Sequence, residues 1–327
     1  MDIDFVVTWV DGNDEEWLEQ KKKYTPNSEE ESINTEIRYR DYGTFKYWFR
    51  AVEKYAPWVN KIYVVTAGHK PEWLDVNSDK IVFVKHSDFI PKKYLPTFNS
   101  NPIELNLHRI NELSENFVLF SDDVFLNKPV TKDDFFHNGL PRNYGVYSPI
   151  IPFKEFSNVV FNNVRMINRN FKRRQNLKKN FLKIFNYKYG LQIMRTVCTL
   201  PWGPAPGYLD MHLTSSLLKS TLVKVWEVEY DELDNTSKNK FRTLSDINHW
   251  VLKYWQIESG KFYPQAISFG KKYTLNEYDE VIEAITKQRK KVICINDDYN
   301  VENYEEKMEK LVNVFEENFP NKSKYEL

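Results

Sequence analysis

Two adjacent carboxylates, Asp122 and Asp123, directly follow a hydrophobic run at residues 116–120. The run predicts a buried strand, and in open α/β sheets ligands bind where such strands end. Carboxylate oxygens are hard ligands that suit Mg²⁺ or Mn²⁺, so the pair predicts a metal site. Because neighbouring side chains on a strand point in opposite directions, we expect only Asp123 to bind the ion directly. The alternative is an acidic pair that only caps a turn.

The elements before this pair alternate between strands and helices. Runs rich in β-branched and aromatic residues predict strands at 5–10, 61–66 and 80–84. Apolar residues at helical spacing predict a helix at about 45–55, with Asp41 as its cap. This alternation is typical of an α/β fold with a mostly parallel sheet and flanking helices.

The same reasoning predicts the remaining elements of the chain. In chain order they are a helix at 101–113 that Asn101 caps, a helix at 211–219, a strand at 222–226, a helix that Asp246 caps, a strand at 292–295 and a helix at 301–319.

Residues 150–200 differ in character, because many Lys and Arg residues, among them Arg173 and Lys179, alternate with apolar ones. The pattern predicts a basic helical insertion within a single catalytic domain at 1–327. Two readings remain open for it. The helices are either an ordinary solvated surface or a face for anionic lipid or a lipid-linked acceptor.

Composition restricts the function classes. Lys and Arg total 46 and Asp and Glu total 46, so the formal net charge is zero. Because the chain has no excess positive charge to attract a polyanion, nucleic acid is not expected as a partner. The two cysteines, Cys198 and Cys294, form no disulfide framework and are predicted to be core thiols of a protein in a reducing compartment. A signal-peptide pattern and the roughly 20 apolar residues of a spanning helix are both missing from the sequence, so we expect a cytoplasmic protein.

Four separated segments of the chain contain distinctive motifs. The first is IDFVVTWVDG at residues 3–12. The third centres on His212 and Arg242, and the fourth is CIND at 294–297. The second and longest segment comprises RYRD at 38–41, AVEKYAPW at 51–58, LPTFNS at 95–100, Ile103 and Glu104, HRI at 108–110 and DDVF at 122–125.

In this order the four segments resemble the conserved regions of the Stealth family. That family includes bacterial capsule hexose-1-phosphate transferases and the animal enzyme that places GlcNAc-1-phosphate on lysosomal glycoproteins. The third segment departs from the family pattern, because Leu213, Thr214 and Ser215 stand where a proline and a second histidine are expected. The resemblance implies a nucleotide-sugar-transferase fold of the GT-A-like type.

The resemblance also implies a reaction. An acceptor hydroxyl attacks the sugar-bearing phosphorus of a UDP-hexose or UDP-N-acetylhexosamine, and UMP leaves. The acceptor is a glycan or a lipid-linked oligosaccharide of a capsular or other surface polysaccharide. A lipid-linked acceptor would bring the protein to the inner face of the plasma membrane as a peripheral protein.

Four residues take catalytic roles in that reaction, each beside a structural alternative. Asp123 would hold Mg²⁺ or Mn²⁺ on the pyrophosphate. Glu104 would hold the acceptor hydroxyl or assist the metal, or else only cap its helix at Asn101. His212 would be the general base, or else a structural histidine. Arg242 would hold the transferring phosphate with paired donors, or else form a salt bridge with Asp246.

The nucleotide is expected over the end of the first strand. Gly12 would allow the backbone to approach it closely. Residues assigned to nucleotide-sugar binding are Thr8, Trp9, Asp11 and Gly12 on the uridine side, Arg40, Asp41 and Lys46 near ribose or phosphate, and Asn296 and Asp297 at the edge of the site.

Two other functions stay open from the sequence. A metal-dependent glycosyltransferase would use the same aspartates but transfer the sugar alone and release UDP. A non-catalytic glycan- or lipid-binding protein would also use the aromatic side chains, which make up 16% of the residues.

Overall fold

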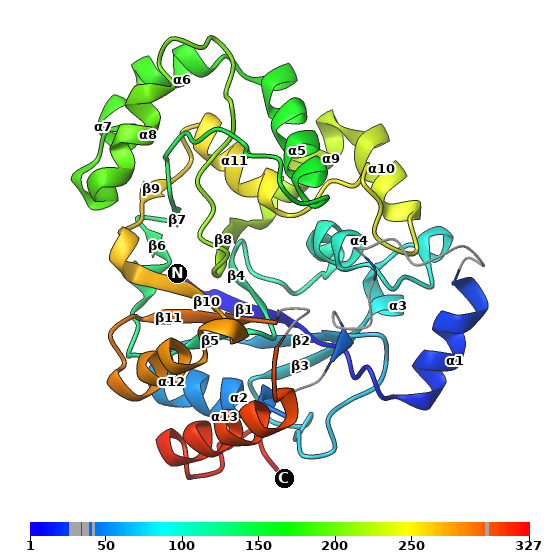
Figure 1. Ribbon diagram of the computed structural model, residues 1–327. Helices are drawn as coiled ribbons and strands as arrows, with labels where there is room; N and C mark the ends of the chain where they lie inside the picture. The colour runs from blue at the N-terminus through cyan, green and yellow to red at the C-terminus, as the bar shows by residue number, and fades with distance from the viewer. Residues whose placement is uncertain (26–33, 35–38, 41–42, 298–300) are drawn as a thin grey trace.

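Five strands form the main sheet of the computed structural model, which describes residues 1–327 except 26–33, 35–38, 41–42 and 298–300 (Figure 1). Their order is β3-β2-β1-β4-β8. The first four run parallel, and β8 runs antiparallel to β4. The strands are β1 (Ile3–Thr8), β2 (Ile62–Thr66), β3 (Ile81–Lys85), β4 (Asn116–Ser121) and β8 (Ser215–Leu218).

Both faces of this sheet are covered. All of β2 is buried, and so is β1 except for Thr8, as parallel strands between two helical layers require. Phe5 and Val7 pack into a core with helix α2 (Phe45–Tyr55), whereas Val6 packs into a second core on the opposite face. The predicted mostly parallel sheet with flanking helices is confirmed.

The order of the strands reverses beside β1, which lies between β2 and β4. Thr8 at the end of β1 pairs with Ser121 at the end of β4. The two chain segments that leave these strands therefore start side by side, at the kind of switch point where open α/β sheets bind ligands.

A second sheet continues from the first. It has the order β10-β11-β5, with β11 parallel to β10 and antiparallel to β5. Its strands are β5 (Val124–Leu126), β10 (Gly270–Thr274) and β11 (Val292–Asn296), and a small third sheet consists of β6 (Phe136–His137), β7 (Leu140–Asn143) and β9 (Tyr263–Pro264). Only two residues separate β4 from β5, so Asp122 and Asp123 form the turn that joins two sheets.

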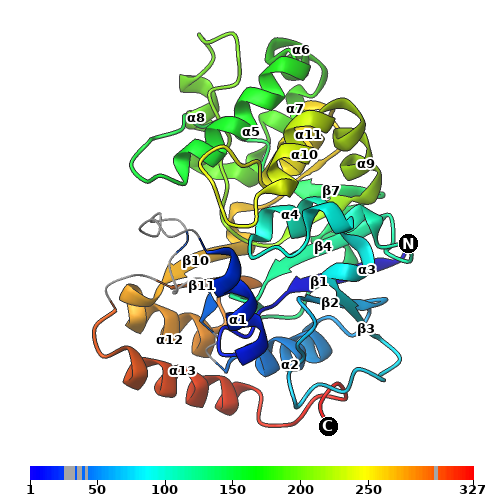
Figure 2. The same ribbon diagram turned by 90° about the vertical axis from the view of Figure 1, so that its right-hand side faces the viewer.

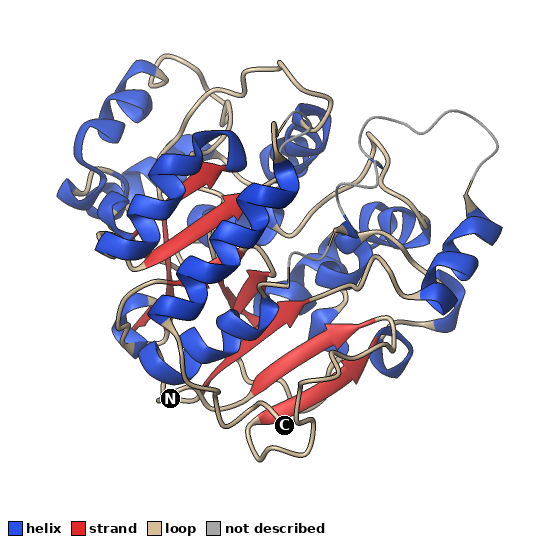
Figure 3. Cartoon of the chain, turned by 60° about the horizontal axis from the view of Figure 1, so that its bottom comes forward, coloured by secondary structure: helices blue, strands red, loops and turns tan. Residues whose placement is uncertain are grey.

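Helices flank the sheets on both sides, as Figure 3 shows by colour. In Figures 1 and 2, α2, α12 (Tyr278–Lys287) and α13 (Tyr304–Asn318) lie below the main sheet. Beside the sheet or above it are α1 (Glu15–Tyr24), α3 (His86–Phe89), α4 (Ser100–Leu105), α9 (Lys219–Val228), α10 (Tyr230–Lys238) and α11 (Trp250–Glu258).

Residues 150–200 contain four of the helices at the upper end of the molecule (Figure 2). They are α5 (Ser157–Asn170), α6 (Arg173–Lys179), α7 (Phe181–Ile184) and α8 (Ile193–Cys198). Among the described residues, no helix is both long enough and apolar enough to cross a membrane.

The helix expected at 101–113 is shorter and begins earlier. Asn99, not Asn101, is its N-cap, because the Asn99 side chain accepts the backbone N–H of Asn101. The helix ends at Leu105, where the side-chain amide of Asn106 donates to the Pro102 carbonyl at 2.8 Å. Such a side chain competes with the backbone for helical partners.

Three later predictions are wrong. Residues expected as a helix at 211–219 include strand β8, and the strand expected at 222–226 lies in helix α9, whose buried residues Leu222, Val225 and Trp226 have helical spacing. Asp246 does not cap α11, which begins at Trp250 after His249. Cys294 is buried as predicted, but Cys198 is exposed at the end of α8.

Candidate active site

Asp123 is held in the turn between the two sheets. Its main-chain carbonyl accepts the N–H of Ile295 at 2.9 Å, and its Oδ2 accepts a hydrogen bond from the Cys294 thiol at 3.4 Å. The other carboxylate oxygen, Oδ1, is buried without a hydrogen-bond partner. Burial raises the pKa of Asp123 above its ordinary range. A buried carboxylate oxygen without a partner is costly, and its lone pairs stay available to a ligand.

His212 completes a cluster with these two side chains. Ligand atoms of Asp123, His212 and Cys294 all lie within 4.8 Å of one another. His212 has a positive φ of 50°, and its backbone N–H donates to Asp210 Oδ1 at 2.7 Å. Burial, with a smaller contribution from the charge of Lys272, lowers the pKa of His212 to about 3. The imidazole is therefore neutral and able to donate a lone pair.

The three side chains could hold a divalent ion. The carboxylate suits Mg²⁺ or Mn²⁺, and the imidazole and the thiol are donors that transition ions accept more readily than Mg²⁺ does. Burial first, and then the charge of Asp123, keep the pKa of Cys294 well above its ordinary range. Asp122 also contributes to that shift, so its carboxylate lies close to the cluster.

Glu104 does not reach back to cap its helix. It pairs instead with His249, whose Nδ1 lies 2.6 Å from Glu104 Oε2. Both side chains are largely buried, with 8% of Glu104 and 14% of His249 exposed. A carboxylate on one ring nitrogen fixes the tautomer and leaves the other nitrogen as a proton acceptor.

The sequence did not predict a role for His249, because it lies outside the four motif segments. It contributes to the electrostatic environment of His212, and the ring of its neighbour Trp250 meets the His212 ring edge-on at 5.8 Å. The start of α11 therefore links the Glu104 pair to the cluster of Asp123, His212 and Cys294.

Arg242 lies beside the start of α4. Its Nη2 donates to Ser100 Oγ at 2.8 Å, and Ser100 is one helical turn before Glu104. The alternative salt bridge with Asp246 does not form between these two described residues. The carboxylate of Asp246 accepts hydrogen bonds instead from Asn99, Asn101, Asn239 and Thr243.

The residues after β1 form a second group. Thr8 ends the strand, and the Trp9 ring stacks on Phe45 with its centroid 5.3 Å away. The Asp11 N–H donates to His69 Nε2 at 3.0 Å. A Cβ on Gly12 would lie 1.8 Å from the carbonyl oxygen of Tyr39. Only glycine fits there, because the two backbone segments touch.

The last predicted residues divide between two places. Arg40 pairs with Asp297 at 3.5 Å, and Asn296 precedes Asp297 at the end of β11, so these three gather at one edge. Lys46 lies over the Tyr47 ring, 5.0 Å from its centroid, and near Glu316 of α13. Its contacts join it to α13 rather than to the Asp123 cluster, and Asp41 lies outside the described residues.

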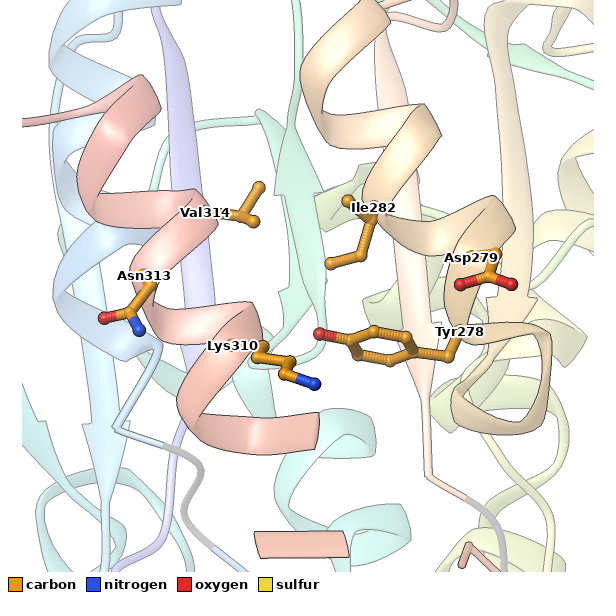
Figure 4. A pocket seen from close by; sticks show the side chains of 6 residues that line it. All are labelled: Tyr278, Asp279, Ile282, Lys310, Asn313 and Val314. Atoms are coloured by element: carbon orange, nitrogen blue, oxygen red, sulfur yellow. The ribbon is translucent and has the colours of Figure 1, made fainter. Parts of the chain in front are cut away.

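A pocket of about 370 Å³ lies elsewhere, between α12 and α13 (Figure 4). None of the predicted site residues lines it. Its lining is Tyr278, Asp279, Ile282, Lys310, Asn313 and Val314.

Three family models match the chain. They are Stealth protein conserved region 1 at residues 1–29, conserved region 2 at 38–143 and conserved region 4 at 283–327. Glu104, Asp123 and Cys294 fall within these matches, whereas His212, Arg242 and His249 lie between them.

Relatives match over nearly the whole chain. The capsular polysaccharide phosphotransferase WcwK of Streptococcus pneumoniae is 47% identical over 99% of this chain and 98% of its own. The exopolysaccharide phosphotransferase cps2G of Lactiplantibacillus plantarum is 40% identical over 99% and 96%. The receptor polysaccharide phosphotransferase WefC of Streptococcus oralis is 42% identical over 99% and 99%.

Among solved structures, the galactosyltransferase LgtC in complex with donor and acceptor sugar analogs is 10% identical. It aligns over 98% of both chains with a TM-score of 0.43.

Proposed function

The chain belongs to the Stealth family, and from that membership we propose that it is a phosphotransferase of capsular or other surface-polysaccharide synthesis. It moves hexose-1-phosphate from a UDP-hexose or UDP-N-acetylhexosamine to a glycan hydroxyl and releases UMP. Relatives with at least 40% identity over the full chain are named as phosphotransferases of such polysaccharides, which supports a transferase that uses a sugar donor and a glycan acceptor.

The observation that carries this proposal is the gathering of Asp123, His212 and Cys294 at the end of β4, beside the end of β1. Phosphoryl transfer depends on positioning and on neutralising charge, more than on covalent chemistry. A buried carboxylate with an unpartnered oxygen next to a neutral imidazole supports such a site.

Asp123, His212 and Cys294 would hold a divalent ion, with Asp122 near it. When bound, the ion would neutralise negative charge on the donor pyrophosphate. This set of ligands favours Mn²⁺ over Mg²⁺, because one donor is a nitrogen and one a sulfur. Chelation by EDTA is therefore expected to abolish transfer, and added Mn²⁺ to restore it.

We assign the base to His249, because Glu104 orients its ring whereas His212 lies among the metal ligands. The acceptor oxygen forms a bond to the sugar-bearing phosphorus, the bond from that phosphorus to the UMP oxygen breaks, and the hydroxyl proton passes to His249. Arg242 would hold the phosphoryl oxygens, which carry the charge in the transition state.

The donor nucleotide is proposed to lie over the end of β1. Asp11 would face the uridine, while Gly12 packs against Tyr39 and Trp9 against Phe45 to hold this segment in place. Arg40 and Asp297 would close the opposite edge of the nucleotide site. A lipid-linked oligosaccharide as acceptor would place the protein at the inner face of the plasma membrane.

The test is product analysis with purified protein, Mn²⁺, a panel of UDP-sugars and a polysaccharide acceptor from the producing strain. Release of UMP that depends on the acceptor is expected. Release of UDP would show a glycosyltransferase instead, and release of neither nucleotide with any donor would favour a binding protein.

A further inference from the structure

Large hydrophobic side chains are exposed mainly on one part of this molecule. Ten of the eighteen that are exposed in the described chain lie in residues 150–200, although this segment is a small part of the chain. Among them, Leu191 is 89% exposed and Leu182 is 78% exposed. The others are Ile151, Phe153, Phe161, Phe181, Tyr187, Met194, Val197 and Leu200. Such a concentration marks an interaction surface, since exposed apolar residues are normally scattered.

The same segment carries almost all its charge with one sign. Residues 150–200 hold eleven Lys or Arg residues and one acidic residue, Glu155, in a chain whose total charge is zero. The segment therefore has a formal charge of +10 beside its exposed apolar side chains.

Part of this positive charge is used inside the fold. Arg173 is buried, where it donates to the Thr199 and Trp202 carbonyls and lies over the Tyr147 ring. It is therefore not part of a basic surface, contrary to what its sequence context indicated. Arg169 pairs with Glu229 and Glu232.

Four further basic side chains are available to a partner. Lys172, Arg174, Lys178 and Lys179 are exposed. Within the described part of the chain, none of these four forms an ion pair with an acidic side chain. They lie on α6 and just before it, next to α7, which presents Phe181 and Leu182 to solvent.

We propose that the helical segment at residues 150–200 docks the protein on an anionic phospholipid membrane. Exposed side chains such as Leu182 and Leu191 enter the boundary between headgroups and acyl chains. Lys178, Lys179 and their neighbours bind lipid phosphates. This is the combination by which interfacial proteins bind membranes without crossing them.

Charge complementarity selects the membrane over a second copy of the chain. A two-fold dimer through this surface would set the same positive segment against itself. An anionic lipid surface instead neutralises all the basic side chains at once and also accepts the apolar ones.

The docking segment also touches the candidate active site. Helix α5 packs on α11, where Asn163 Nδ2 donates to Asn248 Oδ1 at 2.6 Å, and the Phe156 ring meets the Trp250 ring edge-on at 5.4 Å. His249 lies between Asn248 and Trp250. Docking would therefore hold the site near a lipid-linked acceptor, and this consequence alone rests on the proposed function.

Binding is tested by cosedimentation with vesicles of phosphatidylcholine alone and with vesicles that contain 30% phosphatidylglycerol. The wild-type protein should bind only the anionic vesicles, and more weakly as salt is added. Two double variants, K178E/K179E and L182S/L191S, should each raise the apparent Kd at least tenfold. All four side chains are exposed, so circular dichroism should show unchanged folding.

Matched controls make the same kinds of change elsewhere on the surface. K22E/K23E reverses two exposed charges on α1, and V223S/V228S removes two exposed apolar side chains on α9. Both controls should bind like the wild type. The proposal would be overturned if the wild-type protein did not bind anionic vesicles, or if K178E/K179E and L182S/L191S bound them as well as the controls do. So would a wild-type dimer that L182S/L191S dissociates, because the surface would then be an interface between copies.

Vesicle binding needs neither donor nor acceptor, so its test is independent of the transfer reaction. A wild-type protein that binds vesicles but releases no UMP would contradict the proposed phosphotransferase activity only. A wild-type protein that releases UMP but does not bind anionic vesicles would contradict the docking surface only.

Discussion

Asp123 combines two properties that oppose each other in the metal-free protein. Its carboxylate is buried with an unpartnered Oδ1, which costs stability, and the same oxygen is available for a ligand. Burial raises the pKa of Asp123, so the folded state binds a proton there more readily than the unfolded chain does. The resulting stabilisation is present at acidic pH and is lost as the pH rises through the raised pKa.

Asp123→Asn should therefore separate stability from activity. In EDTA at neutral pH, the variant should be more stable than the wild type by about 1 kcal/mol, because no charge is buried. Its transfer rate should fall by about 10³-fold or more. Urea unfolding and a nucleotide-release assay measure the two effects. Asp122→Asn is the matched control and should lose much less activity. A destabilised Asp123→Asn protein would contradict this view of the carboxylate.

The Glu104 and His249 pair can be tested separately from Asp123. His249→Ala should lower kcat by about 10² to 10⁴-fold with little change in KM for the donor, as loss of a general base does. Glu104→Gln should keep the fold and lose part of the rate, because the amide still bonds to the ring but holds it less strongly. A His249→Ala enzyme that keeps the wild-type kcat would show that the base lies elsewhere.

At the scale of elements, Asp246 fixes the segment between α10 and α11 against the start of α4. Its two carboxylate oxygens accept hydrogen bonds from Asn99, Asn101 and Asn239 at 2.7–2.9 Å, and from Thr243. Arg242 and His249 lie in this segment, on either side of Asp246. The fully buried carboxylate therefore holds the backbone that carries Arg242 and His249, the two side chains proposed to act in transfer, close to the helix of Glu104.

Asp246→Ala should accordingly cost about 3 kcal/mol of unfolding free energy, because several buried amide donors lose their acceptor. Transfer should fall as well, through displacement of Arg242 and His249. Glu227→Gln, which removes one exposed partner of Lys224, is the control and should change stability by less than about 0.5 kcal/mol. Chemical denaturation measures both. Equal stability of the two variants would show that the hydrogen bonds of Asp246 contribute little to the free energy of unfolding.

The spacing of apolar residues predicts an element correctly where it fits only a helix or only a strand. Burial on both faces made β2 and β11 hydrophobic runs, and both were predicted. The run at 222–226 fits a strand and a helix equally well, and only its packing in α9 decides between them. The cap of α4 was misplaced by two residues because Asn99 and Asn101 are both good caps.

At the scale of the whole molecule, the sequence led to Asp123 and Glu104 through strand ends and family motifs. It could not lead to the contact of Cys294 with Asp123, because that contact depends on how the second sheet joins the first. His249 was equally inaccessible, since Glu104 meets it only when α4 and α11 fold together. The basic character of residues 150–200 was visible in the sequence, whereas the burial of Arg173 was not.

In the proposed reaction, the β-phosphate of the donor moves together with the sugar. A UDP-sugar labelled with ³²P in the β-phosphate tests it directly, with the polysaccharide acceptor and Mn²⁺ present. We predict that the label enters the glycan product as a phosphodiester while unlabelled UMP is released, and that Asp123→Asn abolishes both. Label that stays in UDP while the unlabelled sugar joins the acceptor would contradict the claim and identify a glycosyltransferase.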